Sequence, residues 1–184
     1  QKMSKSKGNV LDPLSVINEL GADALRFALL HGPEPSQDQK MSRPRLEDAR
    51  NFANKIWNAA RFVINARPAD VPAEYALGLV EEDQFGPAEH WILERCARTT
   101  DALETAYANY EFGEAAGRIY DAIWSDYCDW YLELCKPILA GGEAEANETR
   151  AMAAFVLDRA LILLHPFMPF VTEELWAERA PEKG

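Results

Sequence analysis

Apolar residues recur every three or four positions along most of the chain, which is the period of an α-helix with one buried face. A clear example lies between residues 42 and 67, where Phe52, Ile56 and Val63 mark one side. No stretch alternates apolar and polar residues over the length of a strand. The pattern therefore predicts an all-α fold, arranged as an antiparallel helical bundle.

Capping residues, glycines and prolines divide this pattern into separate helices. Asp12 is expected to cap the first helix, Gly21 to end it, and Asp23 to start the second. Pro137 is expected to end or kink a long helix, and residues 143–146 to form a loop. The predicted helices cover residues 13–20, 23–31, 42–67, 87–107, 111–136, 147–165 and 169–176.

The helix predicted over 111–136 is rich in apolar and aromatic residues. Its period assigns to the buried side Phe112, Ala116, Ile119, Ile123, Tyr127, Trp130 and Leu134. Cys128 and Cys135 lie seven residues apart and are expected to pack inside as reduced thiols. The three cysteines of the chain form no CxxC pattern, so neither a disulfide framework nor a zinc site is predicted.

The composition is that of a globular protein, with 48% hydrophobic and 27% charged residues. No apolar run approaches the roughly 20 residues that span a bilayer, and no secretory signal is visible, so we expect a cytoplasmic protein with no membrane segment. Asp126, Asp129 and Glu133 share one helix face. A solvated acidic face explains this spacing better than a metal site, and no metal site is predicted.

Charge is divided unevenly along the chain. The whole chain carries a net charge of -11, from 19 basic and 30 acidic side chains. Residues 1–67 hold 11 basic and 7 acidic side chains, whereas residues 68–184 hold 8 and 23. A polyanion is attracted by the first part and repelled by the second. Any contact with nucleic acid is therefore expected in the N-terminal third.

One short segment near the N-terminus carries chemistry. Lys2, Met3, Ser4, Lys5 and Ser6 are followed by another lysine and a glycine, which places three ammonium groups within six residues. In a loop these groups can converge on one anion, and flexible point charges suit a triphosphate whose charge moves during a reaction. On charge alone, a solvated basic run is the simpler interpretation.

The complete string changes that interpretation. Lys-Met-Ser-Lys-Ser, followed by Gly-Asn and an Asp-Pro helix start, resembles the KMSKS signature of class I aminoacyl-tRNA synthetases. GADALRF at residues 21–27 resembles the segment that follows this signature in the valine, isoleucine and leucine enzymes. NFANKIWN at 51–58, CDWYLE at 128–133 and HPFMPFVTEELW at 165–176 are similar to the valyl-tRNA synthetase branch in particular.

The resemblance implies two regions and a set of ligands. Residues 1–35 would be the end of the catalytic region, and residues 36–184 a helical anticodon-binding domain. Residues 2–6 would line the ATP site, where Lys5 stabilises the pyrophosphate as the carboxylate of valine attacks the α-phosphate, and Lys2 assists. The implied partners are valine tRNA, ATP with Mg²⁺, and valine, used by a longer, monomeric enzyme.

Other parts of such an enzyme are absent from the sequence. Its second ATP motif, His-Ile-Gly-His, does not occur, and neither do the nucleotide-binding βα units or the editing domain. We therefore expect this chain alone to be inactive in amino-acid activation and to require no cofactor.

The tRNA-binding candidates lie on the long helix predicted after Ser42. Spacings of seven, four, four and three residues put five polar side chains on one face: Arg43, Arg50, Asn54, Asn58 and Arg61. Arginines on such a face can bind phosphates, and asparagines can read unstacked bases. Lys55 is a sixth candidate on the same helix. A solvated polar face opposite the buried residues would produce the same pattern.

Two alternatives remain open. The first is the equivalent region of an isoleucyl- or leucyl-tRNA synthetase, which the strings at 51–58 and 128–133 disfavour. The second is a helical protein-interaction module without RNA binding. The acidic second part of the chain fits that module, but the KMSKS context does not.

Overall fold

The computed structural model describes residues 11–32, 41–66, 85–141 and 143–179. All regular secondary structure in these ranges is helical, which confirms the predicted all-α class. No helix within them is both long and apolar enough to cross a bilayer. The elements are α1 (Pro13–Leu20), α2 (Ala22–Leu30), α3 (Arg43–Ala66), α4 (Pro87–Ala108), α5 (Phe112–Asp121), η4 (Ala122–Tyr131), α6 (Leu132–Leu139), α7 (Glu143–Leu164) and α8 (Pro169–Arg179).

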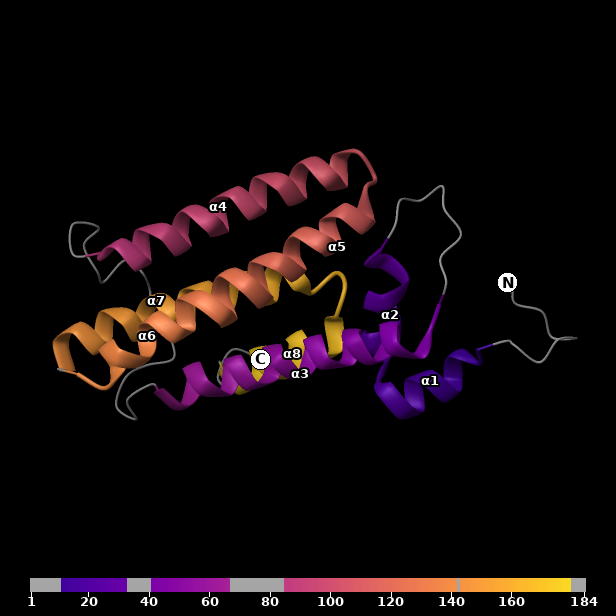
Figure 1. The fold of residues 1–184 in the computed structure, drawn as a ribbon, viewed down its shortest axis with the longest axis horizontal. Helices are drawn as coiled ribbons and strands as arrows, with labels where there is room; N and C mark the ends of the chain where they lie inside the picture. The colour runs from indigo at the N-terminus through magenta and orange to yellow at the C-terminus, as the bar shows by residue number, and fades with distance from the viewer. Residues whose placement is uncertain (1–10, 33–40, 67–84, 142, 180–184) are drawn as a thin grey trace, which may run out of the picture.

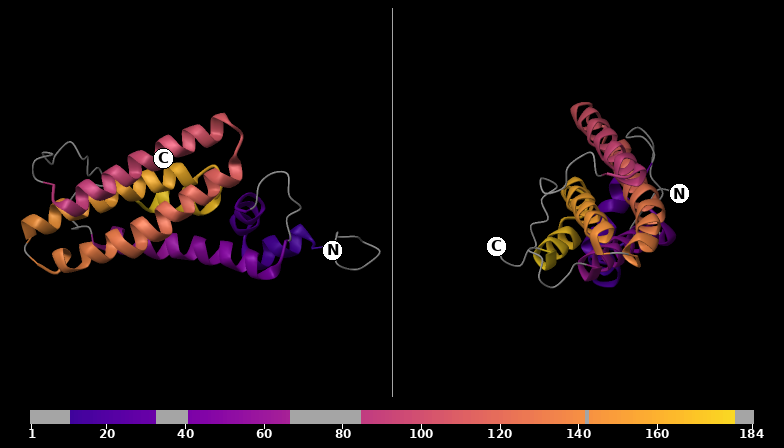
Figure 2. Two further views of the ribbon diagram at one scale, coloured as in Figure 1. Left: turned by 45° about the horizontal axis from the view of Figure 1, so that its top comes forward. Right: turned by 90° about the vertical axis from the view of Figure 1, so that its left-hand side faces the viewer.

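The long helices lie side by side as a bundle, with the short pair α1 and α2 at one end (Figures 1 and 2). α4 and α7 run in one direction, while α3 and the continuous rod of α5, η4 and α6 run in the other (Figure 1). α1 and α2 pack against the N-terminal part of α3, and α8 also contacts α3. The consecutive rods α4, α5–α6 and α7 are therefore antiparallel neighbours, as the sequence predicts.

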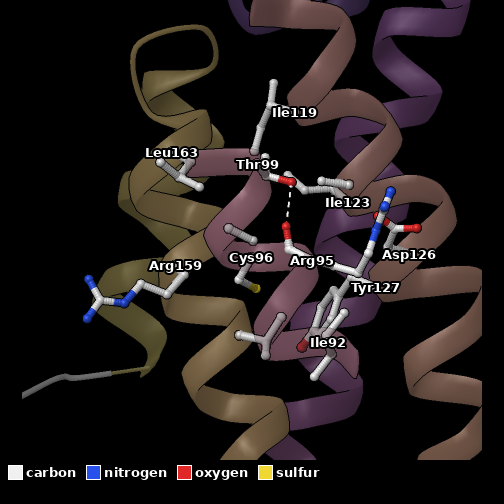
Figure 3. Close-up of a pocket in the computed structure, with 13 residues that line it drawn as sticks. Ile92, Arg95, Cys96, Thr99, Ile119, Ile123, Asp126, Tyr127, Arg159 and Leu163 are labelled. Carbon is white, nitrogen blue, oxygen red and sulfur yellow. Dashed lines mark hydrogen bonds and ion pairs between the residues drawn. The ribbon is translucent and has the colours of Figure 1, made fainter. Parts of the chain in front are cut away.

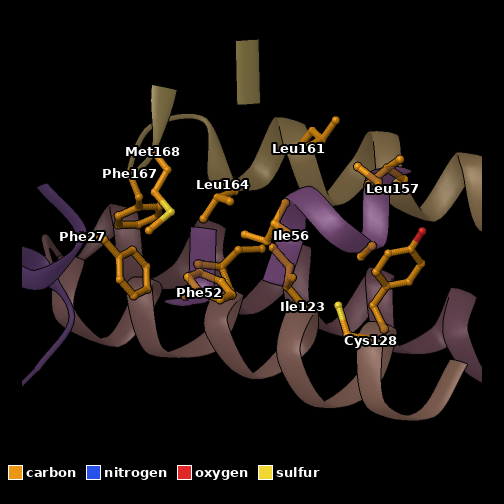
Figure 4. Close-up of a cluster of buried hydrophobic side chains, with 14 of the residues drawn as sticks. Phe27, Phe52, Ile56, Ile123, Cys128, Leu157, Leu161, Leu164, Phe167 and Met168 are labelled. Atoms are coloured by element: carbon orange, nitrogen blue, oxygen red, sulfur yellow. The ribbon is translucent and has the colours of Figure 1, made fainter. Parts of the chain in front are cut away.

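The core fills the space between α3, η4 and α7 (Figure 4). The predicted inner side of α3 is buried, with Phe52, Ile56 and Val63 no more than 6% exposed. Leu157 and Leu164 of α7 belong to the same buried cluster (Figure 4). Burial of such side chains contributes about 25 cal/mol for each Å² of apolar surface, which makes it the main stabilising term of the bundle.

The first helix begins and ends at the predicted residues. The carboxylate of Asp12 accepts hydrogen bonds from the hydroxyl of Ser15 at 2.8 Å and from its backbone N–H at 3.1 Å. Both bonds lower the pKa of Asp12, because they stabilise its charged form. Gly21 ends α1 with a φ of 92°, a conformation that favours glycine.

The prediction that Asp23 starts the second helix is wrong. α2 begins at Ala22, directly after Gly21, and Asp23 lies inside its first turn. Its side chain is instead buried, and its carboxylate accepts hydrogen bonds from the backbone N–H groups of Phe170 at 3.3 Å and Val171 at 2.7 Å. Asp23 therefore caps α8, a helix almost 150 residues further along the chain.

The rod of α5, η4 and α6 confirms the predicted long helix, but its middle is not an α-helix. η4 is a π-helix, in which hydrogen bonds join residue i to residue i+5. The wider turn moves the buried face forward by about one residue. The prediction that Trp130 and Leu134 are buried is therefore wrong, because they are 63% and 47% exposed. Tyr131 and Cys135 take the inner positions, at 0% and 1% exposed.

Before this shift the predicted face is largely correct. Ala116, Ile119, Ile123 and Tyr127 are all at most 3% exposed. Phe112 is the exception at 43%, because it is the first residue of α5 and lies at the end of the bundle.

Two predicted boundaries are wrong. Pro137 does not end the rod, since α6 continues to Leu139. Pro137 removes only its own N–H donor, and the hydrogen bond from the backbone N–H of Ala140 to the carbonyl oxygen of Lys136, at 3.2 Å, continues the helix past it. Residues 143–146 do not form a loop but the first turn of α7, because glutamate and alanine are both strong helix formers.

Candidate nucleic-acid interface

Helix α3 presents the predicted polar face to solvent. Arg43, Arg50, Asn54, Asn58 and Arg61 are all exposed, and their spacing aligns them along one side of the helix. The other side of α3 is held in the core of the bundle. The structure therefore brings these five candidates together on one rigid surface, which is called the α3 face below.

Carboxylates neutralise the N-terminal end of the α3 face. Arg43 forms ion pairs with Glu19 of α1 and, at 2.9 Å, with Glu47 one turn further along α3. The hydrogen bond from Arg43 lowers the pKa of Glu19, and the same bond raises the pKa of Arg43. Exposed ion pairs are weak, so the Arg43–Glu19 pair links α1 to α3 only loosely, and the guanidinium remains exchangeable for another anion.

The middle of the α3 face borders a shallow pocket. Arg50 and Asn54 line it together with the α1–α2 junction, Asp23 and Phe170. Arg50 donates a hydrogen bond to the side-chain oxygen of Asn51 at 3.3 Å. This part of the face therefore combines a cation, an amide and an exposed aromatic ring.

Lys55 lies apart from the other five candidates. Its ammonium group donates a hydrogen bond to Asp129 of η4 at 2.7 Å and lies 5.0 Å from the ring centroid of Trp124. The hydrogen bond to Asp129 raises the pKa of Lys55, because it stabilises the charged form. In the structure, Lys55 joins α3 to η4.

The acidic face of the rod is matched by cations. Asp126 pairs with Arg95 at 2.7 Å, and Asp129 pairs with Lys55. Glu133 is paired with a lysine one turn further along. No group of His, Cys, Asp or Glu that could hold a metal ion occurs within the described ranges.

A second cavity, between α4, η4 and α7, is lined mainly by apolar side chains (Figure 3). Its free space is only about 20 Å³, room for roughly one water molecule. Cys96 lies in its wall, and burial, reinforced by the charge of Asp126, raises the pKa of this thiol to about 11. The cavity is therefore a packing gap and not a ligand site.

The predicted ATP-site residues, Lys2, Met3, Ser4, Lys5 and Ser6, lie outside the described residues. Their roles, and the division of the chain at residue 35, remain predictions.

The structure also reveals a polar and aromatic cavity that sequence reasoning missed. It is lined by residues such as His31, Asp48, Asn51, Tyr120 and Trp124. These residues come from segments far apart in the sequence, so no local spacing could indicate that they meet. The only local signal is the four-residue spacing of Tyr120 and Trp124, which is equally typical of core packing.

Two family models match the chain. Residues 89–184 match the model described as the anticodon-binding domain of tRNA ligase, and residues 1–42 match the model described as tRNA synthetases class I (I, L, M and V). The chain therefore belongs to the class I tRNA ligases that carry an anticodon-binding domain. This confirms the resemblance inferred from the KMSKS string and its context.

Within that family the sequence is similar to valine–tRNA ligases. It is 48% identical over 181 residues to the enzyme of Rhizorhabdus wittichii, a match that covers 95% of this chain and 19% of that enzyme. It is 44% identical over 185 residues to the enzyme of Geobacillus kaustophilus, covering 100% of this chain and 20% of that enzyme. The chain thus spans about a fifth of the length of the curated relatives it matches.

Solved structures of two related enzymes share the fold. One is a leucyl-tRNA synthetase of Agrobacterium radiobacter in a ternary complex with tRNA and LeuAMS, with a TM-score of 0.75 and 21% identity over 97% of this chain and 21% of that one. The other is Mycobacterium tuberculosis methionyl-tRNA synthetase with methionyl-adenylate, with a TM-score of 0.74 and 20% identity over 95% of this chain and 35% of that one. At these identities the likeness concerns the fold.

Proposed function

We propose that this chain is the part of a valine–tRNA ligase that binds the anticodon region of valine tRNA and carries the KMSKS loop of the ATP site. The observation that supports this most is the exposed α3 face in a chain whose sequence is similar to valine–tRNA ligases. Residues 1–35 then belong to the catalytic region and residues 36–184 to the anticodon-binding domain. The complete enzyme acts in the cytoplasm as a monomer.

The chemistry of the α3 face suits a single-stranded RNA loop. Arg50 and Arg61 bind backbone phosphates, since a guanidinium donates several hydrogen bonds in one plane. Asn54 and Asn58 each offer an amide donor and acceptor to the edges of unstacked bases. The acidic remainder of the chain repels RNA, so few phosphates are neutralised and the salt dependence of binding is shallow.

The KMSKS residues contact ATP in the complete enzyme. Lys5 stabilises the pyrophosphate while the valine carboxylate attacks the α-phosphate, and Lys2 assists. The bond between the α-phosphorus and the pyrophosphate oxygen breaks as the bond to the carboxylate oxygen forms. Mg²⁺ accompanies ATP and is bound chiefly by its phosphates. Because the chain has no His-Ile-Gly-His motif, we expect it to show no valine-dependent pyrophosphate exchange by itself.

The two alternatives are less well supported. The chain is 48% and 44% identical to two valine–tRNA ligases, which favours the valine branch over the isoleucyl and leucyl branches. The fold itself does not separate these branches, because leucyl- and methionyl-tRNA synthetases share it. A match to an anticodon-binding domain disfavours a protein-interaction module without RNA binding.

The proposal is tested by changing the α3 face without disturbing the core. Arg61→Gln and Asn58→Ala remove exposed side chains. Each is expected to weaken binding of a valine-tRNA anticodon stem-loop by roughly tenfold, and Arg61→Gln is also expected to reduce the salt slope by about 1. Binding is measured by titration of the full chain at several salt concentrations.

Arg98→Gln is the matched control, because Arg98 is an exposed arginine on α4, away from the α3 face. It is expected to leave stem-loop affinity almost unchanged. The proposal is wrong if Arg98→Gln weakens binding as much as Arg61→Gln, or if the wild-type chain binds no tRNA.

A further inference from the structure

Three half-buried rings form a stacked column at the α2 end of the bundle. The ring centroids of His31 and Tyr120 are 5.1 Å apart with planes inclined by 20°, and those of Tyr120 and Trp124 are 5.5 Å apart with planes inclined by 17°. Lys55 extends the column, with its ammonium group 5.0 Å from the centroid of Trp124. Near-parallel rings at these separations attract one another.

A close approach of two helices brings this column together. A Cβ added at Gly113, near the start of α5, would lie 3.1 Å from the carbonyl oxygen of Gly32 and 3.3 Å from that of Leu30. Glycine therefore permits α5 to approach the end of α2, where His31 lies. Phe52 supports the column from the core side, with its ring centroid 4.7 Å from that of Tyr120.

The column forms one wall of a cavity of about 510 Å³. Arg45, Asp48 and Asn51 of α3 line the cavity on another side. This volume falls within the range of roughly 300–1,000 Å³ that is usual for small-ligand pockets. The cavity opens beside the N-terminal half of α3, on the same helix as the α3 face.

The polar groups of the cavity differ in what they can still bind. Arg45 donates one hydrogen bond to the carbonyl oxygen of His31 and another, of 2.9 Å, to that of Ala28. Its guanidinium is therefore fixed as part of the cavity wall. Asp48 is exposed and forms no ion pair within the described ranges. Asn51 accepts one hydrogen bond from Arg50, and its amide N–H groups donate none within the described ranges. The rim therefore offers a carboxylate acceptor and an amide donor.

This combination fits a nucleobase better than a phosphate. Both ends of the column are already covered, by Phe27 beside His31 and by Lys55 over Trp124. A base therefore packs edge-to-face against the ring edges that line the cavity. A carboxylate accepts a hydrogen bond from an exocyclic amino group, which cytosine, adenine and guanine carry and uracil lacks. Burial, aided by Arg45, lowers the pKa of His31, so its ring is uncharged at neutral pH.

We infer that this cavity binds one unstacked, amino-bearing base of the same tRNA that contacts the α3 face. The inference rests on the proposed function and extends it to a second contact. Asn51 lies ten residues before Arg61 on α3, which corresponds to about 15 Å along the helix axis. One RNA strand that follows the α3 face can therefore reach the cavity.

The test is the affinity of the full chain for valine tRNA after the change Asp48→Asn. Asp48 is exposed, so the variant is expected to fold. If Asp48 accepts a hydrogen bond from a base, affinity falls by roughly tenfold. If Asp48 merely lies near the RNA, loss of a negative charge raises affinity or leaves it unchanged, and the inference is overturned. Asp101→Asn, at an exposed position on α4, controls for the change in net charge.

A second measurement locates the base directly. Ultraviolet cross-linking of bound tRNA, followed by trypsin digestion and mass spectrometry, is expected to mark the peptide that begins at Ile119 and contains Tyr120 and Trp124. Cross-links confined to the peptide 56–61 would overturn the inference while supporting the α3 face. Absence of any tRNA binding would overturn the proposed function as well, so the two failures are distinguishable.

Discussion

The backbone N–H of Val171 donates a 2.7 Å hydrogen bond to the buried carboxylate of Asp23. The bond joins α2 to the first turn of α8, and a second one from Phe170 accompanies it. Helix N-termini leave backbone N–H groups without partners and favour negative charge. A side chain from the N-terminal part of the chain therefore stabilises its last described helix.

Asp23→Ala is expected to lower the free energy of unfolding by about 1–2 kcal/mol, because two N–H groups of α8 lose their partner. Urea unfolding followed by circular dichroism measures the change. Asp101→Ala, at an exposed position, is the control and should have little effect. Equal effects of the two substitutions would show that the cap contributes nothing.

Because of the π-helix, we expect substitutions of two adjacent aromatic residues to have very different effects on stability. Tyr131→Ala removes a fully buried ring and is expected to cost about 3–5 kcal/mol of unfolding free energy. Trp130→Ala removes a ring that is 63% exposed and should cost far less. An uninterrupted α-helical period predicts the opposite order, so thermal unfolding of the two variants tests the shift.

Trp130 and Tyr131 also show which parts of the fold could be predicted from the sequence. The helices, their caps at Asp12 and Gly21, and the inner side of α3 could be predicted, because they depend on local spacing and capping chemistry. The π-helix could not, because its choice between hydrogen-bond patterns is decided by tertiary packing across the bundle. A prediction that assumes 3.6 residues per turn therefore misplaces Trp130 and Leu134.

The candidate site was predictable to a similar extent. The α3 face follows from spacing on one helix, so five of the six tRNA-binding candidates lie together and exposed. Lys55 departs from them because its partner, Asp129, is 74 residues away in the sequence. The cavity beside His31 depends in the same way on contacts between distant segments, which no periodicity encodes.

His31 is expected to make stability depend on pH. Burial and, to a smaller extent, Arg45 lower its pKa in the folded chain, while Asp121 opposes the shift. Below the ordinary value of 6.5 the unfolded chain then binds a proton that the folded chain does not. Stability should therefore fall as the pH decreases below 6.5, until the lowered pKa of the folded state is passed.

The test is the change of the unfolding midpoint with pH in this range. This pH dependence is expected to be smaller in His31→Leu than in the wild type. His90→Leu, at an exposed position, is the control and is expected to keep it. Identical slopes in the wild type and His31→Leu would assign the pH dependence to other groups.

The cysteines are expected to be unreactive in the folded chain. Burial raises the pKa of Cys96 to about 11 and that of Cys128 and Cys135 to about 12. At pH 8 the thiolate fraction is then about one in a thousand or less, and the thiolate is the reactive form. Iodoacetamide should modify no cysteine of the folded chain and all three after unfolding. Rapid modification of Cys128 under native conditions would contradict its buried position.

The most direct test of the central claim is the binding of the full chain, at low salt, to a valine-tRNA anticodon stem-loop and to the same stem-loop with its anticodon replaced. If the α3 face reads anticodon bases, replacement should weaken binding by roughly tenfold or more, as loss of even one or two base hydrogen bonds implies. Equal affinity for both stem-loops would contradict anticodon recognition by this chain and leave only contacts with the RNA backbone.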